Sequence, residues 1–133
     1  MLSHLAVRNY AVIDAVDVEL HEGLSVMTGE TGAGKSILVD ALGLVLGDRA
    51  DAAAVRAGAE RAEIAAQFEC SRLPRALEWL REQGLDDGTE CSVRRLVMRD
   101  GRSKAFINGQ PVNLQALRAL GAVLIDIHGQ HAH

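Results

Sequence analysis

The first third of the chain alternates between short apolar strands and one helical stretch. In residues 16–20, valine and leucine alternate with Asp17 and Glu19, a period of two that buries one face of a strand. Residues 24–28 form another apolar run, which leads directly into a glycine-rich loop. Beyond the loop, apolar residues recur at helical spacing over residues 37–46, and Gly47 is a suitable C-terminal cap. This part of the sequence therefore predicts a strand, a loop and a helix in direct succession.

The middle of the chain is rich in alanine and then regains clear periodicity. Residues 50–66 hold nine alanines, which bury little surface, so we expect a mobile loop or short helices there. Residues 62–69 have the pattern of a strand. Residues 74–84 have the pattern of a helix, with Pro74 in the first turn and Gly84 at the end.

The last third of the chain predicts a hairpin, a helix and a final strand. Residues 91–98 and 103–107 are predicted to be paired strands joined by Asp100-Gly101, a strong turn signal. A second turn follows at Asn108-Gly109. We expect a short helix over residues 114–120 and a strand over the β-rich apolar run at residues 122–127.

Composition narrows the class of protein. A chain of 133 residues with 48% hydrophobic and 24% charged residues is typical of one globular domain and excludes extensive disorder. No apolar run is long enough to span a membrane, and no signal peptide is visible. Cys70 and Cys91 form no disulfide framework and are expected in the core. Since the net charge is −4, any contact with DNA must be local.

The glycine-rich loop carries the most specific chemical signal. It matches the pattern G-x-x-x-x-G-K-[ST] of the phosphate loop of nucleotide-binding proteins, here Gly29-Glu30-Thr31-Gly32-Ala33-Gly34-Lys35-Ser36. Glycines let successive backbone N–H groups turn towards phosphate oxygens, and the helix that follows presents its N-terminus to the same anion. Lys35 is expected near the β- and γ-phosphates, and the Ser36 hydroxyl is expected to bind Mg²⁺.

Several segments together resemble the RecN branch of the SMC-like, ABC-type ATPases. The resemblance covers essentially the whole chain and rests on segments 5–13 and 23–42, Gly47-Asp48-Arg49-Ala50, the hairpin from Asp100 to Gly109, and Ile125-Asp126-Ile127-His128-Gly129-Gln130-His131. It implies an α/β fold, with a phosphate-loop core and mixed sheet joined to an antiparallel β-subdomain. Residues 1–133 would form the N-terminal lobe of an ATPase head, from the Walker A loop to the Q-loop.

The same resemblance implies the cofactors and partners. ATP and Mg²⁺ would bind the phosphate loop, with Lys35 and Gln130 in catalytic roles and with Ser36 and Gln130 at the metal. Arg8 and Asn9 lie where members of the family contact nucleotide. Hydrolysis would need a C-terminal lobe of the same protein and a second head. The whole protein would act on DNA in the recombinational repair of double-strand breaks, in the cytoplasm and at the nucleoid.

Two alternatives from other functional classes remain open. Residues 122–126 also match a Walker B strand, so Asp126 could hold Mg²⁺ in a self-contained small NTPase or kinase. The other alternative is a non-catalytic module that holds nucleotide without turnover. Neither a signature motif nor a heptad array is found, so we expect the ATPase to need further segments.

Three further groups of charged or polar residues have a functional and a structural interpretation. A basic set on the predicted hairpin would either contact a DNA backbone or form a solvated face: Arg94, Arg95, Arg99, Arg102 and Lys104. Arg49 and Arg56 follow the phosphate-loop helix and would either relay DNA contact or lie in solvent. The histidines at 128, 131 and 133 are interpreted as polar loop residues rather than metal ligands.

Overall fold

The described part of the chain is a six-stranded antiparallel sheet with helices on one face. The computed structural model describes residues 2–19, 32–50 and 52–131, with side chains for all of these except 32–36 and 125–131. The strand order is β2-β1-β3-β4-β5-β6. The elements in chain order are β1 (Leu2–Tyr10), β2 (Ile13–Glu19), α1 (Gly32–Val45), the short 3₁₀ helix η1 (Ala52–Ala54), β3 (Arg61–Glu69), α2 (Pro74–Gln83), β4 (Glu90–Met98), β5 (Ser103–Ile107), β6 (Gln110–Val112) and α3 (Leu114–His131).

Alternation along the strands decides which face of the sheet is covered. In β3, every second residue from Ala62 to Phe68 is buried, and the residues between them are only partly buried. The same alternation continues across the paired strands, since Ile64 pairs with Val7 on one side and with Arg95 on the other. Because neighbouring residues of a strand point to opposite faces, one face carries the core and the other is largely polar.

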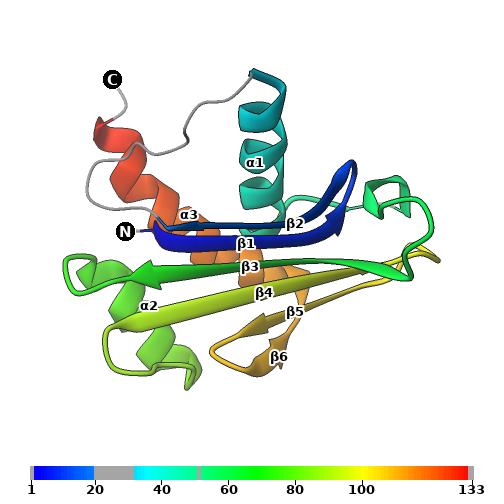
Figure 1. Cartoon of the computed structure of the whole chain (residues 1–133). Helices are drawn as coiled ribbons and strands as arrows, with labels where there is room; N and C mark the ends of the chain where they lie inside the picture. Colours follow the sequence, from blue (N-terminus) through cyan, green and yellow to red (C-terminus); the bar gives the residue numbers. More distant parts are fainter. Residues whose placement is uncertain (1, 20–31, 51, 132–133) are drawn as a thin grey trace.

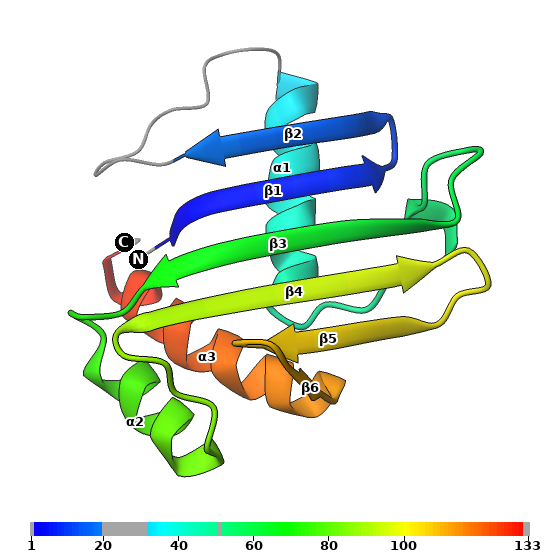
Figure 2. The ribbon, with the colours of Figure 1, turned by 60° about the horizontal axis from the view of Figure 1, so that its bottom comes forward.

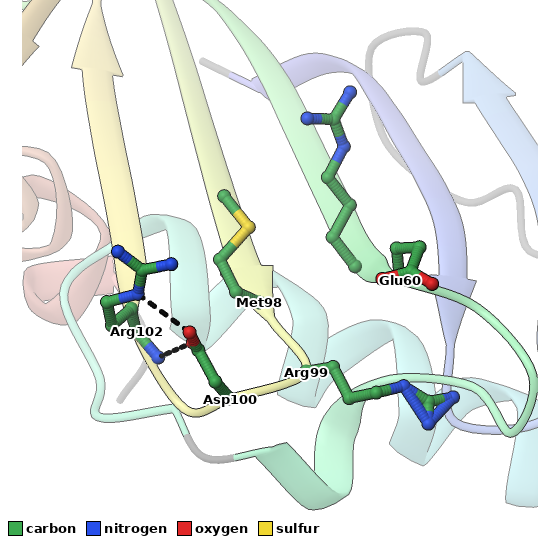
Figure 3. Close-up of a pocket in the computed structure, with 6 residues that line it drawn as sticks. Glu60, Met98, Arg99, Asp100 and Arg102 are labelled. Carbon is green, nitrogen blue, oxygen red and sulfur yellow. Dashed lines mark hydrogen bonds and ion pairs between the residues drawn. The ribbon is translucent and has the colours of Figure 1, made fainter.

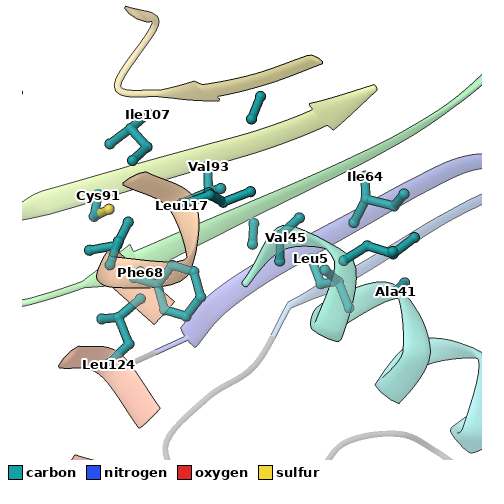
Figure 4. Packing of buried hydrophobic residues seen from close by; sticks show 14 of the residues in the cluster. Leu5, Ala41, Val45, Ile64, Phe68, Cys91, Val93, Ile107, Leu117 and Leu124 are labelled. Atoms are coloured by element: carbon teal, nitrogen blue, oxygen red, sulfur yellow. The ribbon is translucent and has the colours of Figure 1, made fainter. Parts of the chain in front are cut away.

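The helices lie together on the core face. Figure 2 shows α1 and α3 behind the sheet, with α1 running across the strands from the β2 side towards β4. α2 packs against α3 beside the sheet (Figure 1). Ala41 and Val45 of α1, together with Leu117 and Leu124 of α3, meet the buried strand residues in a single apolar cluster (Figure 4).

Most of the elements expected from periodicity and turn signals are confirmed. Strand β3, helix α2 and the β4–β5 hairpin begin and end within two residues of their predicted bounds. Gly84 adopts the left-handed conformation of a helix C-cap, with φ of 71°. The alanine-rich segment contains the short helix η1. The strand predicted over residues 24–28 lies outside the described residues, and the described strands all pair antiparallel.

The prediction of a strand over residues 122–127 is wrong. These residues continue α3, which runs without interruption from Leu114 to His131. The apolar run is helical because Leu117, Leu120 and Leu124 recur at helical spacing and are all buried on the sheet side. Asp126 therefore lies on a helix, and the Walker B interpretation loses the strand that it requires.

Both cysteines are core residues, as expected. Cys70 and Cys91 are fully buried, and each is a free thiol. The pKa of Cys91 is raised, because its thiol hydrogen-bonds to Cys70 and is shielded from water. In the described part of the chain, no helix has the length and apolar character to cross a membrane.

Close contact between α1 and α3 depends on a glycine in α3. A Cβ atom at Gly121 would lie 2.5 Å from the backbone oxygen of Leu46 and 3.2 Å from its Cβ. Gly121 is buried and helical, so its role is to admit the end of α1 and not to supply a special backbone angle. The backbone of α3 therefore approaches the backbone at the end of α1 closely at this point.

Substituting Gly121 tests that contact. Gly→Ala in a helix interior normally stabilises by about 1 kcal/mol. We expect Gly121→Ala instead to lower the free energy of unfolding by about 1–3 kcal/mol, since backbone atoms must move apart. Gly43→Ala in α1 is the matched control, because its new methyl group would meet only the exposed Asp48 side chain. Denaturant unfolding that shows equal effects for both variants would contradict the close contact.

Candidate nucleotide-binding site

The predicted phosphate loop leads into the N-terminus of α1. Residues 29–31 lie outside the described residues, whereas residues 32–36 form the beginning of α1. The first turn carries no acidic residue. The first four N–H groups of a helix have no intrahelical partner, and the helix dipole adds partial positive charge there. This end of α1 therefore has the chemistry to bind phosphate, and the backbone places Lys35 and Ser36 within it.

The opposite end of α1 is held by a buried arginine. Arg95 of β4 is 1% exposed. Its Nη1 donates to the Leu44 carbonyl at 2.6 Å and to the Asp48 carbonyl at 2.9 Å, and its Nη2 donates to Ser103 Oγ at 3.3 Å. A cation at a helix C-terminus is favourable because the last carbonyls are unpaired and partly negative.

A second arginine completes this end of the helix. Arg118 of α3 donates from Nε to the Gly47 carbonyl at 3.1 Å. Burial lowers the pKa of Arg95, the Asp48 carboxylate opposes that effect, and the charge of Arg118 adds to it. Together, Arg95 and Arg118 join the C-terminal end of α1 to β4 and to α3, so the orientation of α1 is fixed from that end.

The interpretation of Arg95 as part of a basic hairpin face is corrected by this geometry. Neighbouring residues of a strand point to opposite faces, so Arg94 and Arg95 cannot share one face of the hairpin. Arg95 occupies a core-face position between Val93 and Val97, whereas Arg94 lies exposed and pairs with Glu63 at 2.8 Å. The signal for the buried position was in the sequence, since alternate residues of this strand are otherwise apolar.

Asn9 and Arg56 are brought together at the end of β1. Asn9 and Ala11 have positive φ angles of 52° and 53°. This turn is held by the alanine-rich segment: the Asn9 carbonyl accepts from the Arg56 N–H at 2.8 Å, and Arg56 Nη1 donates to the Val12 carbonyl at 2.9 Å. Asn9 and Arg56 line a pocket of about 320 Å³ together with Ala57, Gly58 and Ala59.

Arg8 does not join this pocket. Its guanidinium lies 3.5 Å from Asp17 of β2, on the face of the sheet opposite α1. Neighbouring residues of a strand point to opposite faces, so Arg8 faces away from the helix when Val7 packs in the core. The structure thus separates two residues that the sequence presented as a pair, and it gives Asn9 a different neighbour, Arg56.

Tyr10 shows that the end of β1 lies beside α1. Tyr10 is buried, and its pKa is raised, first by burial and then by the negative charge of Asp40. Asp40 follows Ser36 by about one helical turn. The turn that carries Asn9 is therefore close to the middle of α1, about one helical turn beyond Ser36.

The remaining predicted site residues have only a backbone placement. Gln130 lies near the end of α3, in the part of the helix whose side chains the structure does not describe. Its predicted contact with Mg²⁺ or water stays a prediction. Among the side chains that the structure describes, no group of three or more histidine, cysteine, aspartate or glutamate residues gathers as a metal site.

Comparison with known protein families identifies the domain. Residues 1–127 match the family described as the RecF/RecN/SMC N terminal domain. The chain belongs to this family. Members of the SMC and RecN groups are ATPases, in agreement with a phosphate loop at the start of α1.

Full-length relatives agree with the family match. The chain is 51% identical to the DNA repair protein RecN of Vibrio cholerae over 133 residues and 50% identical to that of Haemophilus influenzae over 135. It is 42% identical to RecN of Bacillus subtilis over 132 residues. These matches cover 98–100% of this chain but 23–24% of each relative, so the chain spans about a quarter of their length.

Solved structures share the fold of this RecF/RecN/SMC domain. One, from work on "ATP-driven dimerization and DNA stimulated activation of SMC ATPases", has a TM-score of 0.74 and 23% identity and covers 93% of this chain and 79% of its own. An Smc head domain from Pyrococcus furiosus has a TM-score of 0.74, covering 92% and 32%. The recombination mediator RecF with ATP has a TM-score of 0.64 and 17% identity, covering 92% and 30%. At these identities, the likeness shows the fold alone.

Replacing Arg95 tests how α1 is held. We expect Arg95→Met to lower the free energy of unfolding by about 1–3 kcal/mol, because the buried Leu44 carbonyl and the partly buried Asp48 carbonyl lose their donor. Arg94→Met is the matched control at the adjacent, exposed position and should cost under about 1 kcal/mol. Denaturant unfolding of both variants makes the comparison, and similar losses would show that the buried hydrogen bonds add little.

Tyr10 provides a pH-dependent test of the contact between β1 and α1. It is the single tyrosine of the chain, so its titration is read directly from near-ultraviolet absorbance of residues 1–133. We expect a midpoint above the ordinary 10.0. Because the fold favours the protonated phenol, its contribution to stability is present below pH 10 and is lost as pH rises through the raised pKa.

The charge of Asp40 is tested separately. Asp40→Asn should move the midpoint towards 10.0, because it removes the repulsion of the phenolate. Asp17→Asn, which removes a carboxylate on the opposite face of the sheet, should leave the midpoint unchanged. An unshifted midpoint in the Asp40 variant would place β1 away from α1.

Proposed function

We propose that this chain supplies the ATP- and Mg²⁺-binding N-terminal part of an SMC-like ATPase that acts in the recombinational repair of DNA double-strand breaks. The observation that carries the proposal is the motif at residues 29–36, whose last five residues begin a helix with no acidic residue in its first turn. Membership of the RecF/RecN/SMC family and relatives named DNA repair protein RecN support it. The protein would work in the cytoplasm, at the nucleoid.

Different residues of this chain would bind the phosphates, the metal and the rest of the nucleotide. Backbone N–H groups of residues 29–36 and the Lys35 ammonium would hold the phosphates, and Ser36 would be a ligand of the metal. Mg²⁺, when bound, would neutralise charge on the phosphate oxygens. Gln130 would orient water or metal. Asn9 is the better candidate of the β1 pair for a nucleotide contact, because it lines a pocket with Arg56, whereas Arg8 pairs with Asp17.

Hydrolysis is proposed to need more than these residues. A C-terminal lobe of the same protein would supply the signature motif and the Walker B acid, and a second head would complete each site. One structural neighbour is described in terms of "ATP-driven dimerization", which supports the same arrangement here. The competing proposal of a self-contained NTPase is weakened, because Asp126 lies on α3 and not at the end of a strand.

Lysine substitution tests the nucleotide site. Saturating ATP with Mg²⁺ should raise the unfolding temperature of the protein, since a ligand at 100 times its Kd adds about 2.7 kcal/mol. We expect Lys35→Ala to abolish this shift. Lys104→Ala is the matched control, because it removes the other lysine of the chain from an exposed position on β5. A full ATP shift in the Lys35 variant would refute the proposed phosphate site.

The same preparation tests whether residues 1–133 act alone. We expect them to show negligible ATP turnover, because the acid and the partner's signature serine are proposed to come from elsewhere. Steady hydrolysis that Lys35→Ala eliminates would favour the self-contained NTPase.

A further inference from the structure

Three arginines surround a shallow hollow at one end of the sheet, where β4 turns into β5 and β3 begins. The hollow has a volume of about 490 Å³ and is lined by Glu60, Arg61, Met98, Arg99, Asp100 and Arg102 (Figure 3). We call it the arginine hollow. It is separate from the N-terminus of α1, and the proposed ATP chemistry uses none of these side chains.

The backbone fixes the hollow as one unit. The β4–β5 turn closes with the Met98 N–H donating to the Arg102 carbonyl at 2.7 Å, and Gly101 in the turn has a φ of 96°. The turn is tied to the start of β3, because the Arg99 N–H donates to the Glu60 carbonyl at 3.0 Å. Arg61 pairs in register with Met98, which brings its side chain to the same edge.

The guanidinium groups keep free donors in this arrangement. Arg99 donates from Nε to the Ala59 carbonyl at 2.9 Å, which leaves its terminal N–H groups available. Arg102, with 80% of its side chain exposed, pairs through Nε with Asp100 at 2.8 Å. Within the described residues, Arg61 makes no side-chain hydrogen bond or ion pair.

The balance of charge favours an extended anion over a compact one. The lining holds three arginines and two carboxylates, Glu60 and Asp100. The hollow therefore has a net positive charge, although the net charge of the chain is −4. The Asp100 carboxylate stays ionised, since hydrogen bonds from Arg102 hold its pKa below the ordinary value. Two carboxylates in the lining repel a compact dianion, whereas an extended polyanion can bring separate phosphates to separate guanidinium groups.

The lining also indicates which part of a nucleic acid the hollow would contact. The residues that line the hollow include no aromatic side chain, so it offers no aromatic platform for base stacking. Phe106, on the neighbouring strand, lies under Arg94 with 5.7 Å between the guanidinium carbon and the ring centroid. Arginine contacts to phosphate give affinity and position without reading sequence.

We propose that the arginine hollow binds the phosphate backbone of duplex DNA, independently of sequence. This inference rests on the proposed function for its choice of polyanion. It assigns the contact to the turn between β4 and β5 and to the start of β3. Of the basic set predicted on the hairpin, Arg99 and Arg102 carry the contact, whereas Arg95 belongs to the core and Arg94 is paired with Glu63.

The test measures affinity for DNA against salt in the full-length protein. A labelled duplex is titrated by fluorescence anisotropy over a series of KCl concentrations, with several unrelated sequences. Each phosphate contact contributes about 0.9 to the slope of log K against log salt. We expect the double variant Arg99→Gln/Arg102→Gln to reduce that slope by about two and to weaken binding about tenfold for every sequence alike.

Two further variants keep the result interpretable. Arg61→Gln loses no described contact, so it should fold normally and reduce the slope by about one. Arg72→Gln/Arg81→Gln removes the same charge from exposed positions around α2 and should leave the slope unchanged. DNA-free ATP binding and the unfolding temperature should match the unsubstituted protein in all variants.

The outcomes separate this inference from the proposed function. An unchanged slope in both hollow variants would overturn the inference and leave the ATP site standing. An equal loss in the α2 variant would also overturn it, because general charge would then explain binding. If the unsubstituted protein binds no duplex at any salt, both the inference and the DNA part of the proposed function fail.

Discussion

The arrangement of α1 on the sheet depends on one buried cation among the described side chains, the guanidinium of Arg95. A charged side chain 1% exposed is costly unless its donors are satisfied, and here three acceptors satisfy them. Two of these acceptors are carbonyls at the C-terminal end of α1. The helix whose N-terminus carries the phosphate loop is therefore oriented by a contact at its other end, on a strand far away in the sequence.

The glycine contact supports the same arrangement from the other side. Gly121 admits the Leu46 backbone, and Arg118 bonds to Gly47, so α3 meets the end of α1 as closely as β4 does. Apolar packing alone would let a helix slide or rotate on a sheet. Directional hydrogen bonds from two elements leave α1 one orientation, and with it one direction in which its N-terminal N–H groups point.

Local patterns predicted the elements that are stabilised locally, and failed where a distant partner decides. The β4–β5 hairpin and α2 carry their own turn and cap signals, Asp100-Gly101 and Pro74 with Gly84. Residues 122–127 were misassigned because a short apolar run is compatible with strand and helix alike, and the spacing back to Leu117 decides between them. The motif at 29–36 was recognisable because phosphate binding needs contiguous residues. The pairing of Asn9 with Arg56, and the turning of Arg8 towards Asp17, depend on tertiary contacts that no local pattern specifies.

The pairing of β1 with β3 has a consequence for how this protein folds. These neighbours in the sheet are joined by a long excursion of chain that contains β2, the phosphate loop and α1. Closing such a loop costs conformational entropy before the strand contacts can compensate for it. Sheets built from non-local pairs fold slowly for that reason. The motif at residues 29–36 lies within the loop of chain that this pairing closes. Because local contacts form before non-local ones, we expect the β4–β5 hairpin and α2 to form before β1 pairs with β3.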